Sequence, residues 1–314
     1  MALGFTVADR IYGQGKFSEM RNIRVVLTVS APVAVAACGM TLVIIAGGID
    51  LSAGTSAMLC ATVLACALRS EYPVALAVAM ALLTGAGCGL INGLLIGTLK
   101  IPPFIVTLGT MTIFLGLGKR LAHDWAGATT VTVNREMIPA WLLNLTSTMP
   151  PDWNRVLPNI AAGVWLALAI AAMVAALLRY TVFGRHLYAL GSSEATARLC
   201  GVNILATKVW VYVVAGLLLG VAGIYSFSLV KSATPIEGIG KELKYIAAVV
   251  IGGASLSGGR GSVLGTLAGA VIMGVITSGC DQLGIENSTQ DMIIGVIIIA
   301  AVTLDRFRQR RQES

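Results

Sequence analysis

Few residues in this sequence have the types and spacings that catalysis requires. There is no G-x-x-x-x-G-K-S/T phosphate loop, no H-E-x-x-H zinc sequence and no grouping of Ser, His and Asp. The six cysteines form no C-x-x-C pair, and the chain has only two histidines. We therefore expect a protein that is not an enzyme, with no catalytic residue, no metal and no cofactor, and with no ATPase site of its own.

The polar residues that could line a pathway lie in or beside apolar runs. Asp50, in the sequence GGIDLSAG, is the acidic candidate nearest to such a run. Asp50 can line a pathway at a helix break, where freed backbone groups face water. Asp50 or Ser52 can also cap the helix that follows, and the two roles are compatible. Asn92, Thr107 and Thr110 could face the same pathway, although such residues more often bond neighbouring helices.

A glycine-rich sequence, GGASLSGGRG, occupies residues 252–261. Its backbone N–H groups could cradle an anion. We instead interpret it as a flexible turn between two spans, with Arg260 marking the cytoplasmic side.

The composition shows what must position these residues. Of the 314 residues, 56% are hydrophobic and only 12% are charged, and the mean hydropathy is +0.84. A soluble domain carries about 25% charged residues. These values exclude a soluble domain and a disordered chain. They predict an all-α polytopic membrane protein, because backbone exposed to lipid must satisfy its hydrogen bonds within helices.

Nine charge-free apolar runs are candidate membrane spans, since about 20 apolar residues cross a bilayer. They cover residues 25–47, 51–68, 74–99, 101–118, 156–178, 209–230, 245–259, 261–280 and 292–304. The runs 245–259 and 292–304 are short for a full crossing. The segment 84–97 resembles 266–279, and this match would pair helices of opposite orientation. It suggests an inverted repeat, although a glycine-rich bundle can produce such a match by chance.

The net charge of +7 comes from three segments: residues 1–24 contribute +2, residues 179–208 contribute +3 and residues 305–314 contribute +2. Lys and Arg collect in cytoplasmic loops, so we place the loop 179–208 and the C-terminal tail in the cytoplasm and expect no nucleic-acid partner. Five runs separate this loop from the N-terminus, so helix parity places the basic residues 1–24 outside. A missing first helix explains this conflict better than a run that does not cross.

The loop 179–208 contains a short predicted helix, Ser192 to Leu199. Ser192 or Ser193 can cap it and Glu194 suits its first turn. Ala195, Leu199 and Val202 form a short apolar stripe. Such a helix can lie on the membrane surface or dock into a groove of a partner.

Four sequence motifs occur in a familiar order: GMTLVIIAGGIDLSAGT (39–55), IPPFIVTLGTM (101–111), GRHLYALGSSEATARLCGVN (184–203) and IAAVVIGGASLSGGRGSVLGTLAGA (246–270). Together they resemble the permease subunits of bacterial ABC importers for monosaccharides of the ribose, xylose, arabinose and galactose type. Branched-chain amino-acid permeases are more distantly similar. The resemblance runs from about residue 25 to the tail.

The resemblance implies a multi-pass protein of the bacterial inner membrane that translocates a monosaccharide inward. The implied partners are a cytoplasmic ATPase subunit, a periplasmic solute-binding protein, and a second permease subunit, either identical or different. Members of this family usually have about ten spans and start inside, so this chain starts close to their second span. We expect a polar segment 1–24, one transmembrane domain 25–304 and a basic tail 305–314.

The resemblance also assigns residues to two functions. The loop 184–203 resembles the coupling helix that docks on the ATPase, and its assigned residues are Gly184, Arg185, Leu190, Gly191, Glu194, Ala195, Ala197 and Gly201. A path for a neutral sugar needs small and weakly polar side chains, for which we select Gly47, Gly48, Asp50, Ser52, Asn92, Thr107, Gly253 and Ser255. The alternatives are another cargo (autoinducer-2, a nucleoside or a branched-chain amino acid) or a membrane scaffold subunit without transport.

Overall fold

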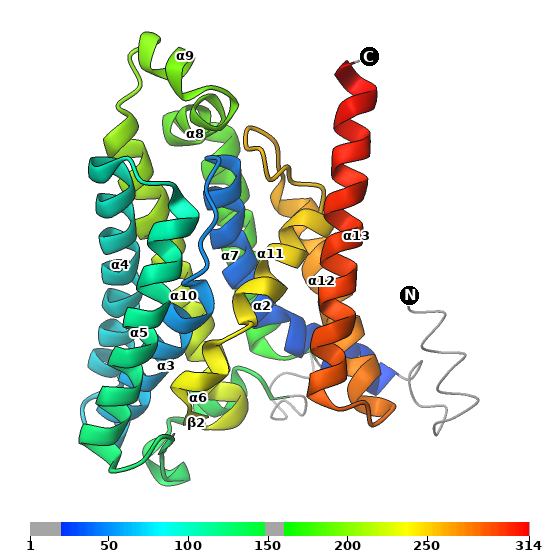
Figure 1. The fold of residues 1–314 in the computed structure, drawn as a ribbon. Helices are drawn as coiled ribbons and strands as arrows, with labels where there is room; N and C mark the ends of the chain where they lie inside the picture. Colours follow the sequence, from blue (N-terminus) through cyan, green and yellow to red (C-terminus); the bar gives the residue numbers. More distant parts are fainter. Residues whose placement is uncertain (1–19, 148–159, 314) are drawn as a thin grey trace.

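Helices make up nearly all of the structure, as expected for an all-α protein. The computed structural model describes residues 20–147 and 160–313, and these form an upright bundle (Figure 1). The helices are α2 (Met20–Ile45), α3 (Ala53–Arg69), α4 (Val74–Leu99), α5 (Pro103–Ala126), α6 (Ala140–Asn144), α7 (Ala162–Tyr180), α8 (Val182–Ser192), α9 (Glu194–Leu199), α10 (Ile204–Val230), α11 (Lys241–Ile251), α12 (Val263–Gln282) and α13 (Asn287–Glu313). The strands β1 (Val131–Thr132) and β2 (Ser232–Ala233) pair antiparallel.

The count of nine spanning helices is not confirmed. Among the described residues, six helices are long and apolar enough to cross a bilayer, namely α2, α4, α5, α7, α10 and α12. The helix α11 has 11 residues and is therefore about 17 Å long, roughly half of the hydrocarbon core. The helix α3 has 17 residues, and the apolar part of α13 is also short. Residues 1–19 of the expected polar segment and residues 156–159 of the fifth run lie outside the described part of the chain.

Two of the short helices start inside the bundle rather than at its surface. The chain enters the bundle after α2 and begins α3 at mid-depth, and it enters from the opposite end after β2 and begins α11 at a similar depth (Figure 1). From these starting points α3 and α11 run toward opposite ends of the bundle. The 3-10 turn η3 (Pro235–Gly238) precedes α11 and packs against α3. The N-termini of α3 and α11 therefore meet within the bundle.

Glycines bring α4 and α10 into close backbone contact. A Cβ atom added at Gly85 would overlap the Gly216 carbonyl, and one added at Gly89 would overlap the carbonyl of Tyr212. At Gly93 an added Cβ would lie 2.8 Å from the Cα of Val209. The spacing of four residues places these glycines on one face of α4, as in other membrane helix pairs that approach through small residues. The α2–α12 pair packs on the other side of the bundle.

The two ends of the bundle differ in what they carry. The helices α8 and α9 lie at the same end as the C-terminal end of α13, whereas α6 and the β1–β2 pair lie at the other end (Figure 1). The start of α2 lies at the end opposite to α8 and α9. The two basic segments that the sequence places in the cytoplasm thus lie at one end of the molecule.

Candidate functional site

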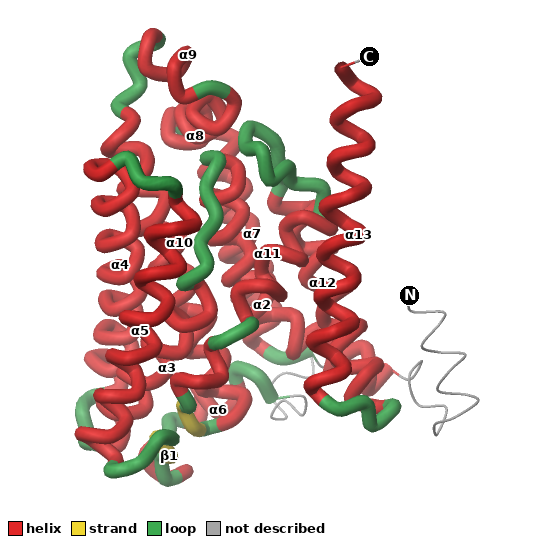
Figure 2. Tube along the Cα trace, in the orientation of Figure 1, coloured by secondary structure: helices red, strands yellow, loops and turns green. Residues whose placement is uncertain are grey.

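The chain unwinds between α2 and α3. A left-handed φ of +80° at Gly47 turns the chain, and residues 46–52 run back between the helices to the start of α3 (Figure 2). Thr107 of α5 holds this segment. Its hydroxyl accepts a 3.1 Å hydrogen bond from the amide of Leu51 and lies 3.1 Å from the carbonyl oxygen of Ile49. Thr107 therefore replaces helical hydrogen bonds that the break removes. This replacement is needed because backbone groups in apolar surroundings must be hydrogen-bonded within the protein.

A chain of buried hydrogen bonds joins the break to two further helices. The Asp50 carboxylate accepts bonds from the amide and the hydroxyl of Ser52, at 2.9 and 2.6 Å. The Asn92 amide of α4 donates to the Ser52 hydroxyl at 2.8 Å, and the Thr110 hydroxyl of α5 donates to Asn92 at 2.7 Å. All four residues are buried. Ser52 occupies the N-cap position of α3 as expected, but its side chain bonds Asp50 and makes no cap hydrogen bond.

Glu242 is a second buried carboxylate, at the start of α11. Its Oε1 accepts a 3.0 Å bond from the amide of Gly240, whereas no described residue bonds its Oε2. Glu242 faces the first turn of α3, where a Cβ at Gly54 would lie 2.6 Å from Oε2 and would overlap the Gly238 carbonyl. The N-terminal ends of α3 and α11 thus touch through glycines. Asp50 and Glu242 place carboxyl groups beside these ends, where helix dipoles are positive.

Tyr212 of α10 has a hydroxyl that no described residue bonds, although the residue is only 3% exposed. A Cβ at Gly48 would lie 2.7 Å from this hydroxyl, so Tyr212 contacts the unwound segment directly. Neither Tyr212 nor Glu242 was among the predicted site residues. Tyr212 was hidden in an apolar run, and Glu242 lies in the charged stretch KELK, outside every run. The free oxygens and the surrounding amides and hydroxyls can hydrogen-bond a polar solute.

The helices α8 and α9 form the loop 181–203, which contacts the ends of other helices. A Cβ at Gly191 would overlap the Ile45 carbonyl and would lie 2.6 Å from the Gly259 amide. That amide donates a 2.9 Å bond to Ile45, and the Tyr188 hydroxyl donates one to Gly261 at 2.9 Å. The α8 helix is therefore packed on the end of α2 and on the loop between α11 and α12.

The predicted helix Ser192 to Leu199 is found in part, because Ser192 ends α8 and α9 begins at Glu194. Ser193 caps α9 by accepting a 3.2 Å bond from the Thr196 amide. The predicted stripe is not buried as a unit. Val202 is buried, but Ala195 is exposed and Leu199 is 89% exposed. The buried residue of α9 is instead Ala197, because α9 turns this side toward α10.

Of the other predicted coupling residues, some are buried in contacts with the bundle and some lie at the surface. Gly184 and Leu190 are buried, and a Cβ at Gly184 would overlap the Leu178 carbonyl. Arg185 is exposed, and Gly201 has a φ of +81° and turns the chain after α9. Leu199 is 89% exposed, and α9 lies at the outer edge of this end of the molecule (Figure 1).

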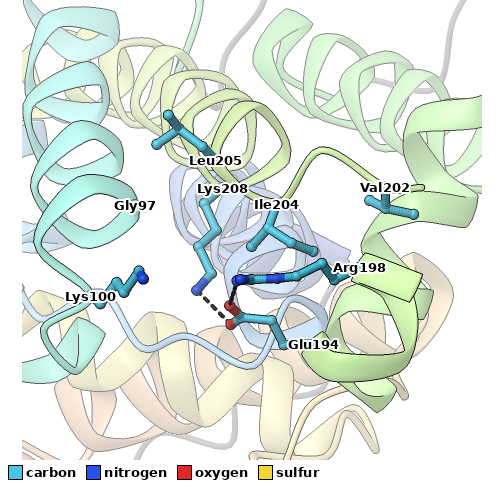
Figure 3. A pocket seen from close by; sticks show the side chains of 8 residues that line it. All are labelled: Gly97, Lys100, Glu194, Arg198, Val202, Ile204, Leu205 and Lys208. Carbon is cyan, nitrogen blue, oxygen red and sulfur yellow. Dashed lines mark hydrogen bonds and ion pairs between the residues drawn. The ribbon is translucent and has the colours of Figure 1, made fainter. Parts of the chain in front are cut away.

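Glu194 ties α9 to α10. Its carboxylate lies 2.7 Å from the Lys208 ammonium of α10 and 3.2 Å from the Arg198 guanidinium of its own helix (Figure 3). The hydrogen bond from Lys208 is the main cause that lowers the pKa of Glu194 below its ordinary value. Glu194 is therefore charged at neutral pH and links the two helices electrostatically.

The residues predicted to line one path occupy two places. Asp50, Ser52, Asn92 and Thr107 are joined at the break, and Gly48 touches Tyr212 there. Gly253 and Ser255 belong instead to the loop 252–262, which lies at the end near α8 (Figure 1). A Cβ at Gly258 of this loop would lie 3.0 Å from the Cα of Gly47, so Gly47 sits between the two places. The loop is a turn closed by its own bonds, including Ser255 to Arg260 at 3.0 Å.

Comparison with known proteins places these features in context. The family model described as branched-chain amino acid transport system / permease component matches residues 22–302. The chain is 35% identical to the ribose import permease protein RbsC of Escherichia coli (strain K12), over 93% of this chain and 88% of that protein. It is 39% identical to RbsC of Bacillus subtilis (strain 168), over 92% and 86%, and 32% identical to the galactose/methyl galactoside import permease protein MglC of E. coli K12, over 96% and 91%. No solved structure matches the chain.

Proposed function

The chain belongs to the family of branched-chain amino acid transport system permease components, and on that premise we propose that it is the membrane subunit of an ABC importer that carries a monosaccharide into a bacterial cell. The names of its relatives specify sugars, which favours a sugar over a branched-chain amino acid as cargo. As a permease of this family it is a multi-pass membrane protein.

The contact between Gly191 and Ile45 is the observation that carries the proposal. It joins the surface loop of α8 and α9 to the last residue of α2, and the next seven residues form the break that contains Asp50. A displacement of α8 must therefore move one end of the unwound segment. We propose that an ATPase subunit docks on α8 and α9, and that closure of the ATPase dimer reshapes the break to admit and release the sugar.

The charge distribution supports the proposed orientation. The end with α8, α9 and the C-terminal tail faces the cytoplasm, where Lys and Arg collect, and the end with α6 and the β1–β2 pair faces the periplasm. A periplasmic solute-binding protein would deliver the sugar to that second end. A second permease subunit, identical or different, completes the dimer that the ATPase pair requires.

The two short helices α3 and α11 support the proposed inverted repeat. In this arrangement α2, α3 and α4 correspond to α10, α11 and α12. The helices α3 and α11 start inside the bundle and run in opposite directions, α2 packs on α12, and α10 packs on α4. The matched segments 84–97 and 266–279 lie in α4 and α12. Transporters commonly place their substrate site where such repeats meet at discontinuous helices.

Reconstitution of the permease with its ATPase and its binding protein tests the proposal. Ribose or galactose bound to the binding protein is expected to raise ATP hydrolysis several-fold and to drive uptake of labelled sugar into proteoliposomes. Stimulation by autoinducer-2, a nucleoside or a branched-chain amino acid, with no response to any sugar, would reassign the cargo. Failure of the ATPase to purify with the permease would favour a scaffold without transport.

A further inference from the structure

A pocket of about 260 Å³ lies between the ends of α4 and α10 and the helix α9 (Figure 3). Its lining residues are Gly97, Lys100, Glu194, Arg198, Val202, Ile204, Leu205 and Lys208. Three of these side chains are cations and one is an anion, so the lining carries a net charge of +2. The remaining residues are apolar or glycine.

The single carboxylate does not balance the three cations. Glu194 pairs with Lys208 at 2.7 Å and with Arg198 at 3.2 Å. The ammonium of Lys100 points into the same space from the end of α4 (Figure 3), and no described residue forms an ion pair with it. The pocket therefore presents excess positive charge with one unpaired ammonium group, which suits a small anion such as a phosphate group.

The surroundings of the pocket favour a lipid as the source of this anion. The outer face of α4 is exposed along most of its apolar length, as expected for a helix in contact with hydrocarbon. Leu99 beside Lys100 is 57% exposed, and Leu205 in the pocket wall is 43% exposed. Trp210, less than two turns along α10, is 58% exposed, and tryptophan is typical of the boundary between headgroups and hydrocarbon. An acyl chain can lie on these side chains while its phosphate enters the pocket.

We propose that this pocket binds the phosphate group of an anionic phospholipid, held by Lys100 together with Lys208 and Arg198. Basic pockets between membrane helices at the cytoplasmic side bind such headgroups. The assignment to the inner leaflet rests on the orientation proposed above, whereas the binding does not. A phosphate group in the pocket competes with Glu194 for Lys208, so bound lipid loosens the tie between α9 and α10.

Native mass spectrometry of the purified permease tests the binding with three probes: phosphatidylglycerol, phosphatidylcholine and inorganic phosphate. The test variant is Lys100→Gln, and Lys231→Gln is its matched control. Lys231 also follows the end of a long helix in a left-handed conformation (φ of 61° against 55° for Lys100), but it lies at the opposite end of the bundle. The conservative variant Lys100→Arg and the thermal midpoint of each variant show whether a loss reflects charge or unfolding.

We expect wild type to retain phosphatidylglycerol at least about 5-fold more than phosphatidylcholine, and we expect the same of Lys100→Arg and Lys231→Gln. Lys100→Gln is expected to lose most of this preference. The reason is that a unit charge near the membrane surface contributes about 1 kcal/mol, or about 5-fold. Equal retention by Lys100→Gln and wild type overturns the site. Equal retention of the two lipids overturns its charge basis, and complete displacement of phosphatidylglycerol by millimolar phosphate assigns the pocket to a soluble anion. If wild type shows no preference for phosphatidylglycerol but keeps its sugar-stimulated ATP hydrolysis, the lipid site alone is overturned. If wild type shows the preference but no sugar-stimulated ATP hydrolysis, only the proposed transport function is overturned.

Discussion

Gly191 in α8 faces the carbonyl oxygen of Ile45 in α2 so closely that an added Cβ would overlap that oxygen. The variant Gly191→Ala must therefore push α8 away from the end of α2. We expect sugar-stimulated ATP hydrolysis in the reconstituted complex to fall several-fold while the basal rate remains. Gly87→Ala in α4 is the matched control, because nothing lies within 4 Å of its added Cβ. An unchanged stimulation ratio in Gly191→Ala would contradict the proposed contact-driven coupling.

The ion pair between Glu194 and Lys208 predicts a result for exchanged charges. Glu194→Lys places a fourth cation beside Lys100, Arg198 and Lys208 and is expected to weaken coupling several-fold. Adding Lys208→Glu restores one opposed pair and is expected to restore part of the coupling. Lys208 lowers the pKa of Glu194, so the ion pair is fully formed at any pH above the ordinary pKa of a glutamate. It is lost only as the pH falls through the lowered pKa. Coupling by wild type is therefore expected to be insensitive to Glu194 between about pH 6 and pH 8. A failure of the double variant to recover any coupling would argue against the pair.

The close approach of α4 and α10 predicts opposite results for two glycines only two residues apart. Gly89→Ala is expected to destabilise the permease by about 1–3 kcal/mol, because its Cβ would overlap the Tyr212 carbonyl. Gly87→Ala on the other side of α4 meets open space and is expected to leave the thermal midpoint unchanged or slightly raised. Thermal unfolding in detergent measures both, and equal midpoints would refute the packing.

The bonds of Asn92 predict a loss of stability. Asn92→Ala leaves the hydroxyls of Ser52 and Thr110 without their observed bonds to this side chain, and we expect a cost of about 1–2 kcal/mol. Thr112→Ala in α5 removes an exposed hydroxyl whose observed bonds are to its own helix, so it should be nearly neutral. Similar midpoints for the two variants would show that the buried chain of bonds contributes little.

The unbonded hydroxyl of Tyr212 separates stability from transport. Tyr212→Phe removes no observed bond, so the thermal midpoint should hold, whereas Tyr225→Phe removes a 2.6 Å bond to the Gly163 carbonyl and should lower it. If the sugar passes the break, Tyr212→Phe should also lower the uptake rate several-fold in proteoliposomes. Normal uptake by this variant would remove Tyr212 from the path.

Much of the membrane architecture follows from composition and periodicity. Charge-free runs located the helices well, since a charge inside the bilayer is costly wherever it lies. They could not show that the run 245–259 contains only the half-length α11, because hydropathy does not report where a helix starts within the bundle. The inner end of α11 was invisible to the runs because Glu242 sits inside the protein, shielded from lipid by α3.

The candidate site was partly predictable for a similar reason. The motif GGIDLSAG marks a break, and so Asp50 and Ser52 could be singled out from their neighbours. Tyr212 reaches the break only through the packing of α10 on α2 and α4, a contact between segments far apart in the chain. The loop with Gly253 and Ser255 resembles the break in sequence, yet the structure places it beside α8 because α11 ends near that surface.

The bonds that α2 makes with later segments also determine the order in which the helices of this protein can pack. Three groups of α2 bond much later segments: Asn22 accepts a bond from Ser278, Thr41 bonds Thr266, and the Ile45 carbonyl accepts the amide of Gly259. During synthesis α2 enters the membrane long before residues 259–278 leave the ribosome. Until then these three long-range bonds are missing, so a chain stopped before α12 holds an incompletely packed α2 and is a natural target for quality-control proteolysis.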